Sequence, residues 1–125
     1  MHLALCVPIG IAQRQPKPAG QEEQVPPEED ASSLPKEYSF NPLQATKEIK
    51  VGNYYMKRGK YQAAAQRFRE ATKWNAQLPE AFLRLGEAED KLKDRKGARE
   101  AYAKYLELAP EEKEAKEVKK RVAKM

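Results

Sequence analysis

Residues 45–70 read ATKEIKVGNYYMKRGKYQAAAQRFRE, and residues 79–104, which lie 34 positions further along, read PEAFLRLGEAEDKLKDRKGAREAYAK. Small and aromatic residues recur between the two stretches at this interval: the pairs are Gly52 and Gly86, Ala64 and Ala98, and Phe68 and Tyr102. A fixed period between about 20 and 50 residues is typical of stacked copies of one supersecondary unit. The sequence therefore predicts a tandem repeat.

Within each period the apolar residues follow the spacing of an amphipathic helix. Gly59 stands where a first helix should end, because glycine readily adopts the left-handed conformation that stops a helix. Pro79 and Pro110 suit the first turn of a helix, where the missing N–H is not needed. We therefore expect five helices, at about residues 43–58, 61–74, 79–92, 95–108 and 111–124.

This pattern resembles the tetratricopeptide repeat, and the likeness covers residues 45–112. The residues that match the repeat are small, aromatic or apolar: Gly52, Tyr55, Gly59, Tyr61, Ala64, Phe68, Ala71, Phe82, Leu85, Gly86, Ala98, Tyr102 and Pro110. The resemblance implies an all-α, right-handed superhelix spanning residues 43–125. Its parts would be two helix-turn-helix repeats, residues 45–78 and 79–112, and a C-terminal capping helix over 111–124.

Three positions depart from the repeat pattern. Glu48 and Glu89 each replace an aromatic residue, and Ala76 replaces the proline that usually ends the first repeat. These departures predict irregular packing within the same fold.

The resemblance also implies that the first helix of each repeat lines a concave groove, which receives a peptide segment or helix of another protein. The predicted groove residues are Lys50, Asn53, Tyr54, Met56, Lys57, Leu83, Arg84, Glu87, Asp90 and Lys91. Some members of the family clamp the carboxylates of an acidic C-terminal peptide. Asn53 fits that clamp, but Ile49 stands in place of its lysine and Arg84 in place of its asparagine. We therefore do not expect this chain to carry the clamp.

The C-terminal helix has a narrow apolar seam, formed by Ala115, Val118, Val122 and Met125. Solenoids usually need about three repeats for stability, so the seam could cover the last repeat as a cap. Alternatively, it could pair with a second copy of the chain in a homodimer. The sequence leaves both open.

The repeat region has few of the side chains that usually carry catalysis. Residues 41–125 contain no histidine, cysteine or serine, and the single histidine and cysteine are His2 and Cys6. The repeat region therefore lacks the pairs that activate a nucleophile and the clusters that bind zinc. We predict a protein that is not an enzyme and that needs no cofactor or metal.

Charge divides the chain in two. Residues 1–40 carry three basic and six acidic side chains, whereas residues 41–125 carry 21 basic and 13 acidic ones. Basic residues of the repeat region alternate with acidic ones at helical spacing, as from Glu117 to Arg121, which is typical of a solvated, ion-paired surface. Nucleic-acid binding is therefore a weaker hypothesis than protein binding.

The N-terminal part has two segments. Residues 1–12, MHLALCVPIGIA, are apolar and end in small residues, like the remnant of a secretory signal, and Cys6 raises the alternative of lipidation. Residues 13–40 are rich in proline and glutamate, which predicts a disordered linker. No stretch reaches the ~18 apolar residues of a transmembrane helix.

Residues 51–68, VGNYYMKRGKYQAAAQRF, also resemble a segment of the periplasmic outer-membrane assembly lipoproteins of the BamD type. With the signal-like start, this likeness favours an exported protein of a bacterial envelope. The alternative is a cytoplasmic protein.

Overall fold

The computed structural model describes residues 37–125, which form five α-helices and no strand. The helices are α1 (Pro42–Lys57), α2 (Tyr61–Trp74), α3 (Pro79–Lys91), α4 (Arg95–Leu108) and α5 (Ala115–Ala123). The signal-like segment, with Cys6 as the candidate site of lipidation, and most of the predicted linker lie outside the described residues. Four of the five helices begin and end within a residue of where the sequence predicts them.

Local chemistry explains the helix ends. Asn41 caps α1, since its side chain accepts a hydrogen bond from the Gln44 N–H at 3.0 Å, and Asp94 caps α4 in the same way through Gly97. Gly59 follows α1 with φ of 74°, in the left-handed region that favours glycine. Pro79 is the first residue of α3, as predicted.

The fifth helix differs from its prediction, because it begins at Ala115 and not near residue 111. The chain between α4 and α5 makes turns instead, with backbone bonds from Glu112 N to Ala109 O (3.3 Å) and from Ala115 N to Glu112 O (3.0 Å). Bonds that span three residues form a tighter coil than an α-helix. These turns redirect the chain so that Ala115 and Val118 reach the core, where they are 2% and 1% exposed.

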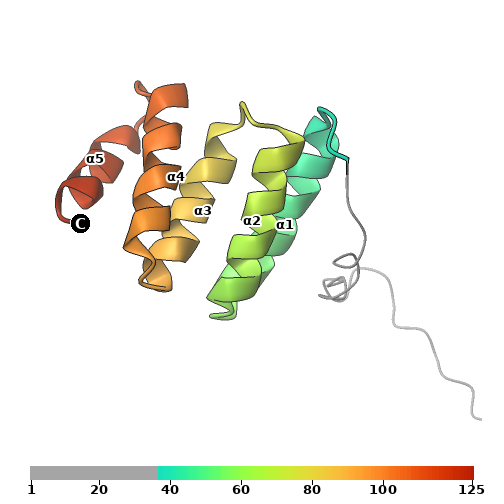
Figure 1. Cartoon of the computed structure of the whole chain (residues 1–125), viewed down its shortest axis with the longest axis horizontal. Coiled ribbons are helices and arrows are strands. Elements are labelled where there is room, and N and C mark those ends of the chain that lie inside the picture. Colours follow the sequence, from blue (N-terminus) through green and yellow to red (C-terminus); the bar gives the residue numbers. More distant parts are fainter. Residues whose placement is uncertain (1–36) are drawn as a thin grey trace, which may run out of the picture.

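The helices follow one another in chain order along a row, as Figure 1 shows, and alternate between two layers. Helix α2 packs against both α1 and α3, and α4 packs against α3 and α5. Residue 37 enters at the α1 end of the row, and the C-terminus lies at the α5 end. Helices α1 and α3 also contact one another, so they form one layer and α2 and α4 the other.

Two glycines set the distance between the helices of each repeat. A Cβ atom on Gly52 would lie 2.7 Å from Cδ1 of Phe68, and one on Gly86 would lie 2.6 Å from Cδ1 of Tyr102. Both rings are 0% exposed, so they fill the space that a larger residue would need. The absence of a side chain at these glycines therefore lets the paired helices approach closely in both repeats.

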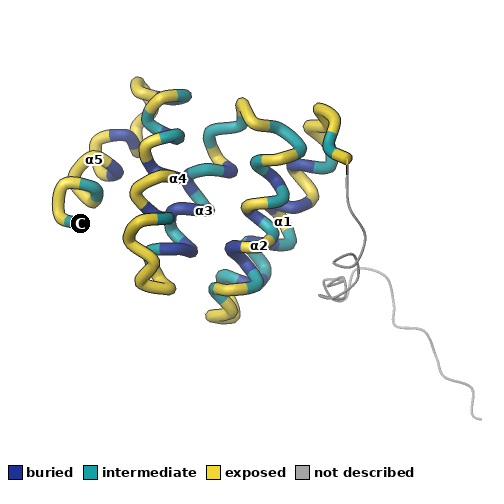
Figure 2. Tube along the Cα trace, viewed as in Figure 1, coloured by how far each residue is buried: buried dark blue, intermediate teal, exposed yellow. Residues whose placement is uncertain are grey.

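The buried residues, dark in Figure 2, form two clusters. One joins α1, α2 and α3, with Ala101 of α4, around Phe68, and the other joins Leu83 to α4 and α5 around Tyr102. Val122 and Met125 pack against the second cluster. The apolar seam of α5 is thus occupied within the chain, in the manner of the cap.

Candidate protein-binding surface

Six of the ten predicted groove residues lie at matching positions of α1 and α3 and define a surface that we call the A-helix face. It consists of Lys50, Asn53, Lys57, Arg84, Glu87 and Lys91. On each helix these residues are three or four positions apart, so they lie on one side of it. Because α1 and α3 are in contact, the two halves of the A-helix face adjoin.

The α1 half of this face is basic. Lys50 and Lys57 are exposed, and neither ammonium group has an ion-pair partner among residues 37–125. Asn53 lies between them along the helix and is half-buried. Two unpaired cations and an amide can attract and hydrogen-bond an anionic group of a partner.

In the α3 half, basic and acidic side chains pair with one another. The Arg84 guanidinium donates a hydrogen bond to Glu87 at 3.0 Å and lies 3.7 Å from Glu80. Burial disfavours the charge of Arg84, but the bond to Glu87 and the attraction of both carboxylates outweigh it and raise its pKa. Glu87 also lies 3.9 Å from Arg121 of α5. Arg84 is therefore paired with carboxylates of its own helix.

Three of the predicted groove residues are placed differently. Leu83 is 5% exposed in the second core cluster, so it offers almost no surface to a partner. Met56 is half-buried against the first cluster. Tyr54 is also half-buried against the first cluster, with the Arg58 guanidinium 3.7 Å from its ring centre. Asp90 is half-buried and Lys91 exposed, with the Lys91 ammonium 6.0 Å from the Tyr61 ring.

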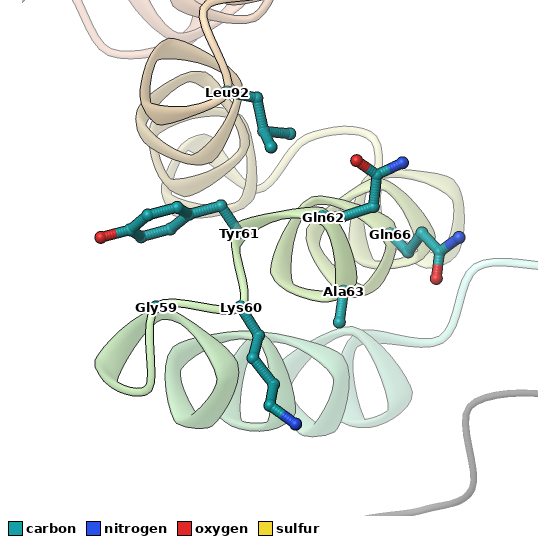
Figure 3. Close-up of a pocket in the computed structure, with 7 residues that line it drawn as sticks. All are labelled: Gly59, Lys60, Tyr61, Gln62, Ala63, Gln66 and Leu92. Atoms are coloured by element: carbon teal, nitrogen blue, oxygen red, sulfur yellow. The ribbon is translucent and has the colours of Figure 1, made fainter.

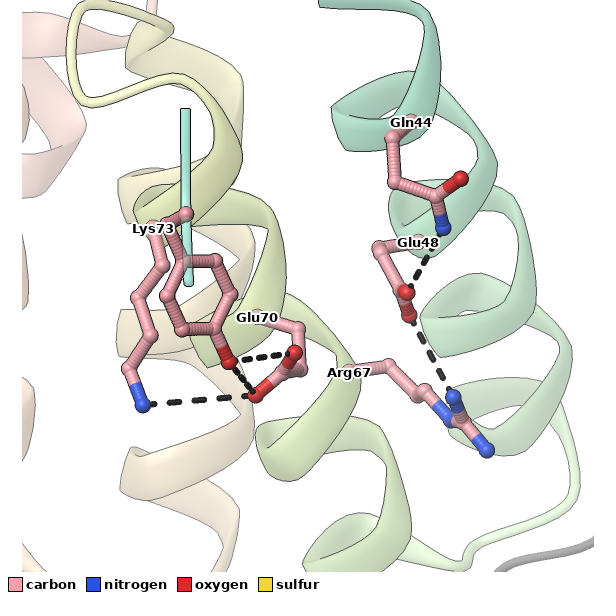
Figure 4. A network of polar contacts seen from close by, with 6 residues as sticks. Gln44, Glu48, Arg67, Glu70 and Lys73 are labelled. Carbon is pink, nitrogen blue, oxygen red and sulfur yellow. Dashed lines mark hydrogen bonds and ion pairs between the residues drawn. The ribbon is translucent and has the colours of Figure 1, made fainter. Parts of the chain in front are cut away.

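The two glutamates that depart from the repeat pattern are buried but paired with arginines of α2. Glu48 accepts a hydrogen bond from the Gln44 amide at 3.0 Å and forms an ion pair with Arg67 at 3.4 Å (Figure 4). Glu89 pairs with Arg69 at 3.0 Å. Burial raises the pKa of Glu89, and the bond from Arg69 opposes the rise. The sequence signals these buried acids but not their partners.

Tyr38 was expected in the linker but packs against α2. Its hydroxyl group donates to the Glu70 carboxylate, with both oxygens at 2.8 Å, and its ring meets Trp74 edge-on at 4.8 Å. Burial and the Glu70 carboxylate raise the pKa of Tyr38 to about 12. The packed region therefore begins by Tyr38, earlier than composition suggests. An aromatic residue at the end of a polar segment was the available signal.

One open cleft of about 470 Å³ lies elsewhere, beside the turn between α1 and α2 (Figure 3). It is lined by Gly59, Lys60, Tyr61, Gln62, Ala63, Gln66 and Leu92. None of the predicted groove residues lines it. Most of its lining residues are exposed, so the cleft is a shallow hollow of the surface.

Residues 37–125 contain no group of three or more histidine, cysteine or acidic residues arranged to hold a metal. None of the helices within this range is long and apolar enough to span a membrane.

The sequence profile of the tetratricopeptide repeat matches residues 55–122, which is more than half of the chain. The chain belongs to the tetratricopeptide-repeat family. This finding, with the five helices, confirms the predicted fold. Repeats of this kind are protein-interaction modules, so the match also supports a role in binding other proteins.

Among solved structures, this tetratricopeptide-repeat protein is similar to the TPR domain of Arabidopsis OM64. The TM-score is 0.61 and the identity 28%, over 67% of this chain and 69% of that one. It also matches the first TPR of Spaghetti (RPAP3) bound to the HSP90 peptide SRMEEVD, with a TM-score of 0.33 and 19% identity over 68% and 94% of the two chains. That second likeness is too weak to inform function. No curated protein matches the chain.

Proposed function

We propose that this protein is a non-catalytic adaptor, which holds a peptide segment or helix of another protein on its A-helix face. The observation that carries the proposal is the pair Lys50 and Lys57, two exposed cations without ion-pair partners in the described part of the chain. Cations that no neighbour neutralises are available to a partner, and they attract its anionic groups over several ångströms. Asn53 adds a hydrogen-bonding amide between them.

The test is a double charge reversal on the α1 half, Lys50→Glu with Lys57→Glu. Arg84 is left unchanged, because a glutamate there would face Glu80 and Glu87 and disturb α3. A partner captured from the native host by the full chain should bind the variant at least tenfold more weakly. Far-UV circular dichroism should stay unchanged, since both residues are exposed.

The matched control is Lys96→Glu with Arg99→Glu, which makes the same change in charge at exposed positions of α4, in the other layer. The control should retain the partner. Equal capture by both double variants and the unaltered chain would contradict the assignment of the A-helix face.

We further propose a bacterial-envelope setting, supported by the signal-like residues 1–12 and by the likeness of residues 51–68 to lipoproteins of the BamD type. Fractionation of the native host tests it. Recovery of the protein in the periplasm is expected, and recovery in the cytoplasm alone would refute the setting.

Self-association through α5 has less support, because Ala115 and Val118 are already buried against α4. Residues 41–78 and residues 113–125, at the two ends of the row, also both carry excess positive charge. Like charges at the two ends oppose end-to-end stacking of copies. Sedimentation at micromolar concentration should therefore show a monomer.

A further inference from the structure

The exposed side of α1 includes a second set of residues, beside those of the A-helix face, which we call the N-terminal face. It consists of Leu43, Lys47, Val51, Tyr54 and Arg58, at intervals of three or four residues along the helix. Leu43 is 69% exposed, and Val51 and Tyr54 are half-buried against the first core cluster. Among the described residues no helix covers this side, since α1 packs only against α2 and α3. Figure 1 shows α1 and α2 at the end of the row.

The interior of the stack shows which kind of element covers such a side. The counterparts of Lys47, Val51 and Tyr54, 34 residues on, lie on α3: they are Ala81, Leu85 and Ala88, which are 0%, 8% and 0% exposed. These three residues share the first core cluster with α2, which packs against α3. A second helix of a repeat thus covers the corresponding side of the next first helix. The geometry available at α1 is that of a docking site for one helix.

Charge selects the chemistry of that helix. Lys47 and Arg58 are exposed and have no ion-pair partner in the described chain, and the Arg58 guanidinium lies 3.7 Å from the ring centre of Tyr54. The one acidic residue of α1, Glu48, is turned to Arg67 and is buried. At the interior interface the covering helix supplies the cation, Arg69, and the covered helix supplies Glu89. On α1 the cations are on the covered helix, so its partner must supply the acids.

We propose that the N-terminal face binds an acidic amphipathic helix of a partner protein, which packs on α1 as α2 packs on α3. Lys47 and Arg58 are eleven residues apart, about 16 Å along the helix axis. The partner helix therefore carries two carboxylates about eleven residues apart, with small apolar residues between them that pack on Val51 and Tyr54. Such a helix complements the N-terminal face, in which a cation lies at each end of an apolar centre.

The test uses a labelled synthetic helical peptide with two glutamates eleven residues apart and alanine and leucine between them. A second peptide has lysines at the two glutamate positions. Fluorescence anisotropy with the full chain should show binding of the glutamate peptide and at least tenfold weaker binding of the lysine peptide. Salt should weaken the glutamate complex, because its ion pairs are at the surface.

The protein variant Lys47→Glu with Arg58→Glu should lose at least tenfold in affinity for the glutamate peptide and gain affinity for the lysine peptide. This exchange of preference cannot come from unfolding, which would abolish both interactions. The variant Lys96→Glu with Arg99→Glu, on α4, should bind the glutamate peptide within twofold of the unaltered chain. Lys50 and Lys57 neighbour the N-terminal face, so the variant Lys50→Glu with Lys57→Glu should lose less affinity than the Lys47 and Arg58 variant and should not come to prefer the lysine peptide.

Equal binding of both peptides, or no binding of either, would overturn the proposal. Loss of binding only in the Lys50 and Lys57 variant would move the site to the A-helix face. The acidic residues of this chain's own N-terminal part are the competing occupant. Neutralising them by Glu28→Gln, Glu29→Gln and Asp30→Asn should leave affinity unchanged, and a tenfold gain would assign the N-terminal face to that segment instead.

Discussion

The two repeats pack alike and yet carry opposite charge. Phe68 covers Gly52 in the first repeat as Tyr102 covers Gly86 in the second, with nearly the same spacing. Residues 41–78, however, carry eight basic and two acidic side chains, whereas residues 79–112 carry seven and nine. Close approach of two backbones admits few residue types, but an exposed helix surface admits many. The repeats therefore share a scaffold, and the first of them carries the excess of positive charge.

The core itself shows a second contrast. The first repeat has Glu48 and Tyr55 at the two positions where the second has Phe82 and Glu89. Each repeat thus buries one carboxylate, and α2 supplies an arginine to both. A buried carboxylate is tolerated where a cation and hydrogen bonds compensate for the lost water. Helix α2 therefore allows a glutamate to replace an aromatic residue in both repeats, because it pairs with both carboxylates.

Removing either buried ring should have the largest effect on the free energy of unfolding. Unequal losses at the two rings would show that the repeats are not equivalent. Phe68→Ala and Tyr102→Ala should each lower the free energy of unfolding by about 3–5 kcal/mol, because each leaves a cavity around a fully buried ring. Urea denaturation followed by circular dichroism measures this. Phe40→Ala is the control, since Phe40 is 72% exposed and should change stability by less than about 0.5 kcal/mol. A small loss at only one of the two rings would show that the repeats are not equally packed.

Filling the glycine positions tests the same equivalence more finely. In Gly52→Ala and Gly86→Ala the new methyl group would meet a buried ring, at 2.7 Å from Cδ1 of Phe68 and 2.6 Å from Cδ1 of Tyr102. Overpacking costs about 1–3 kcal/mol, and the helix propensity of alanine returns up to about 1 kcal/mol. We expect a net loss of about 1–2 kcal/mol in each variant by urea denaturation. Gln66→Ala, at an exposed position of α2, should be neutral or slightly stabilising, and stabilisation by either glycine substitution would contradict the tight approach.

The buried acids should show the smallest effect, and it should depend on pH. Arg69→Ala removes the partner of Glu89 and should cost about 1 kcal/mol at neutral pH, a modest figure because the Arg69 side chain is 45% exposed. Burial raises the pKa of Glu89, and loss of Arg69 raises it further. A raised folded-state pKa favours the folded state below the unfolded pKa, and this benefit is lost as pH rises through the folded value. The deficit of the variant should therefore shrink as pH falls through the raised pKa of Glu89.

The control for this prediction is Glu89→Gln in the Arg69→Ala background, which removes the titrating group. Denaturation of the double variant should show no such recovery at acid pH, and a double-mutant cycle then isolates the pair. An unchanged pH dependence in the double variant would mean that another acid is responsible.

Much of the fold could be predicted from the sequence because its decisive signals are local or periodic. Gly52 and Gly86 mark the helix crossings, and Gly59 and Pro79 mark helix ends, each for a reason that one residue type carries. The start of α5 was missed because Pro110 is equally compatible with a helix and with the turns that the chain makes there. Tyr38 was missed because its partners, Glu70 and Trp74, lie more than 30 residues away.

The sequence by itself determined that paired helices recur, that small residues lie where they cross, and that the repeat region lacks histidine, cysteine and serine. Only the tertiary structure decided which polar side chains are available to a partner. Leu83 is buried, Arg84 is held by two carboxylates, and Lys50 and Lys57 remain without ion-pair partners in the described chain. The reason is physical: burial and charge pairing depend on groups from different helices meeting in space, and the helical period records only which side of a helix a residue is on.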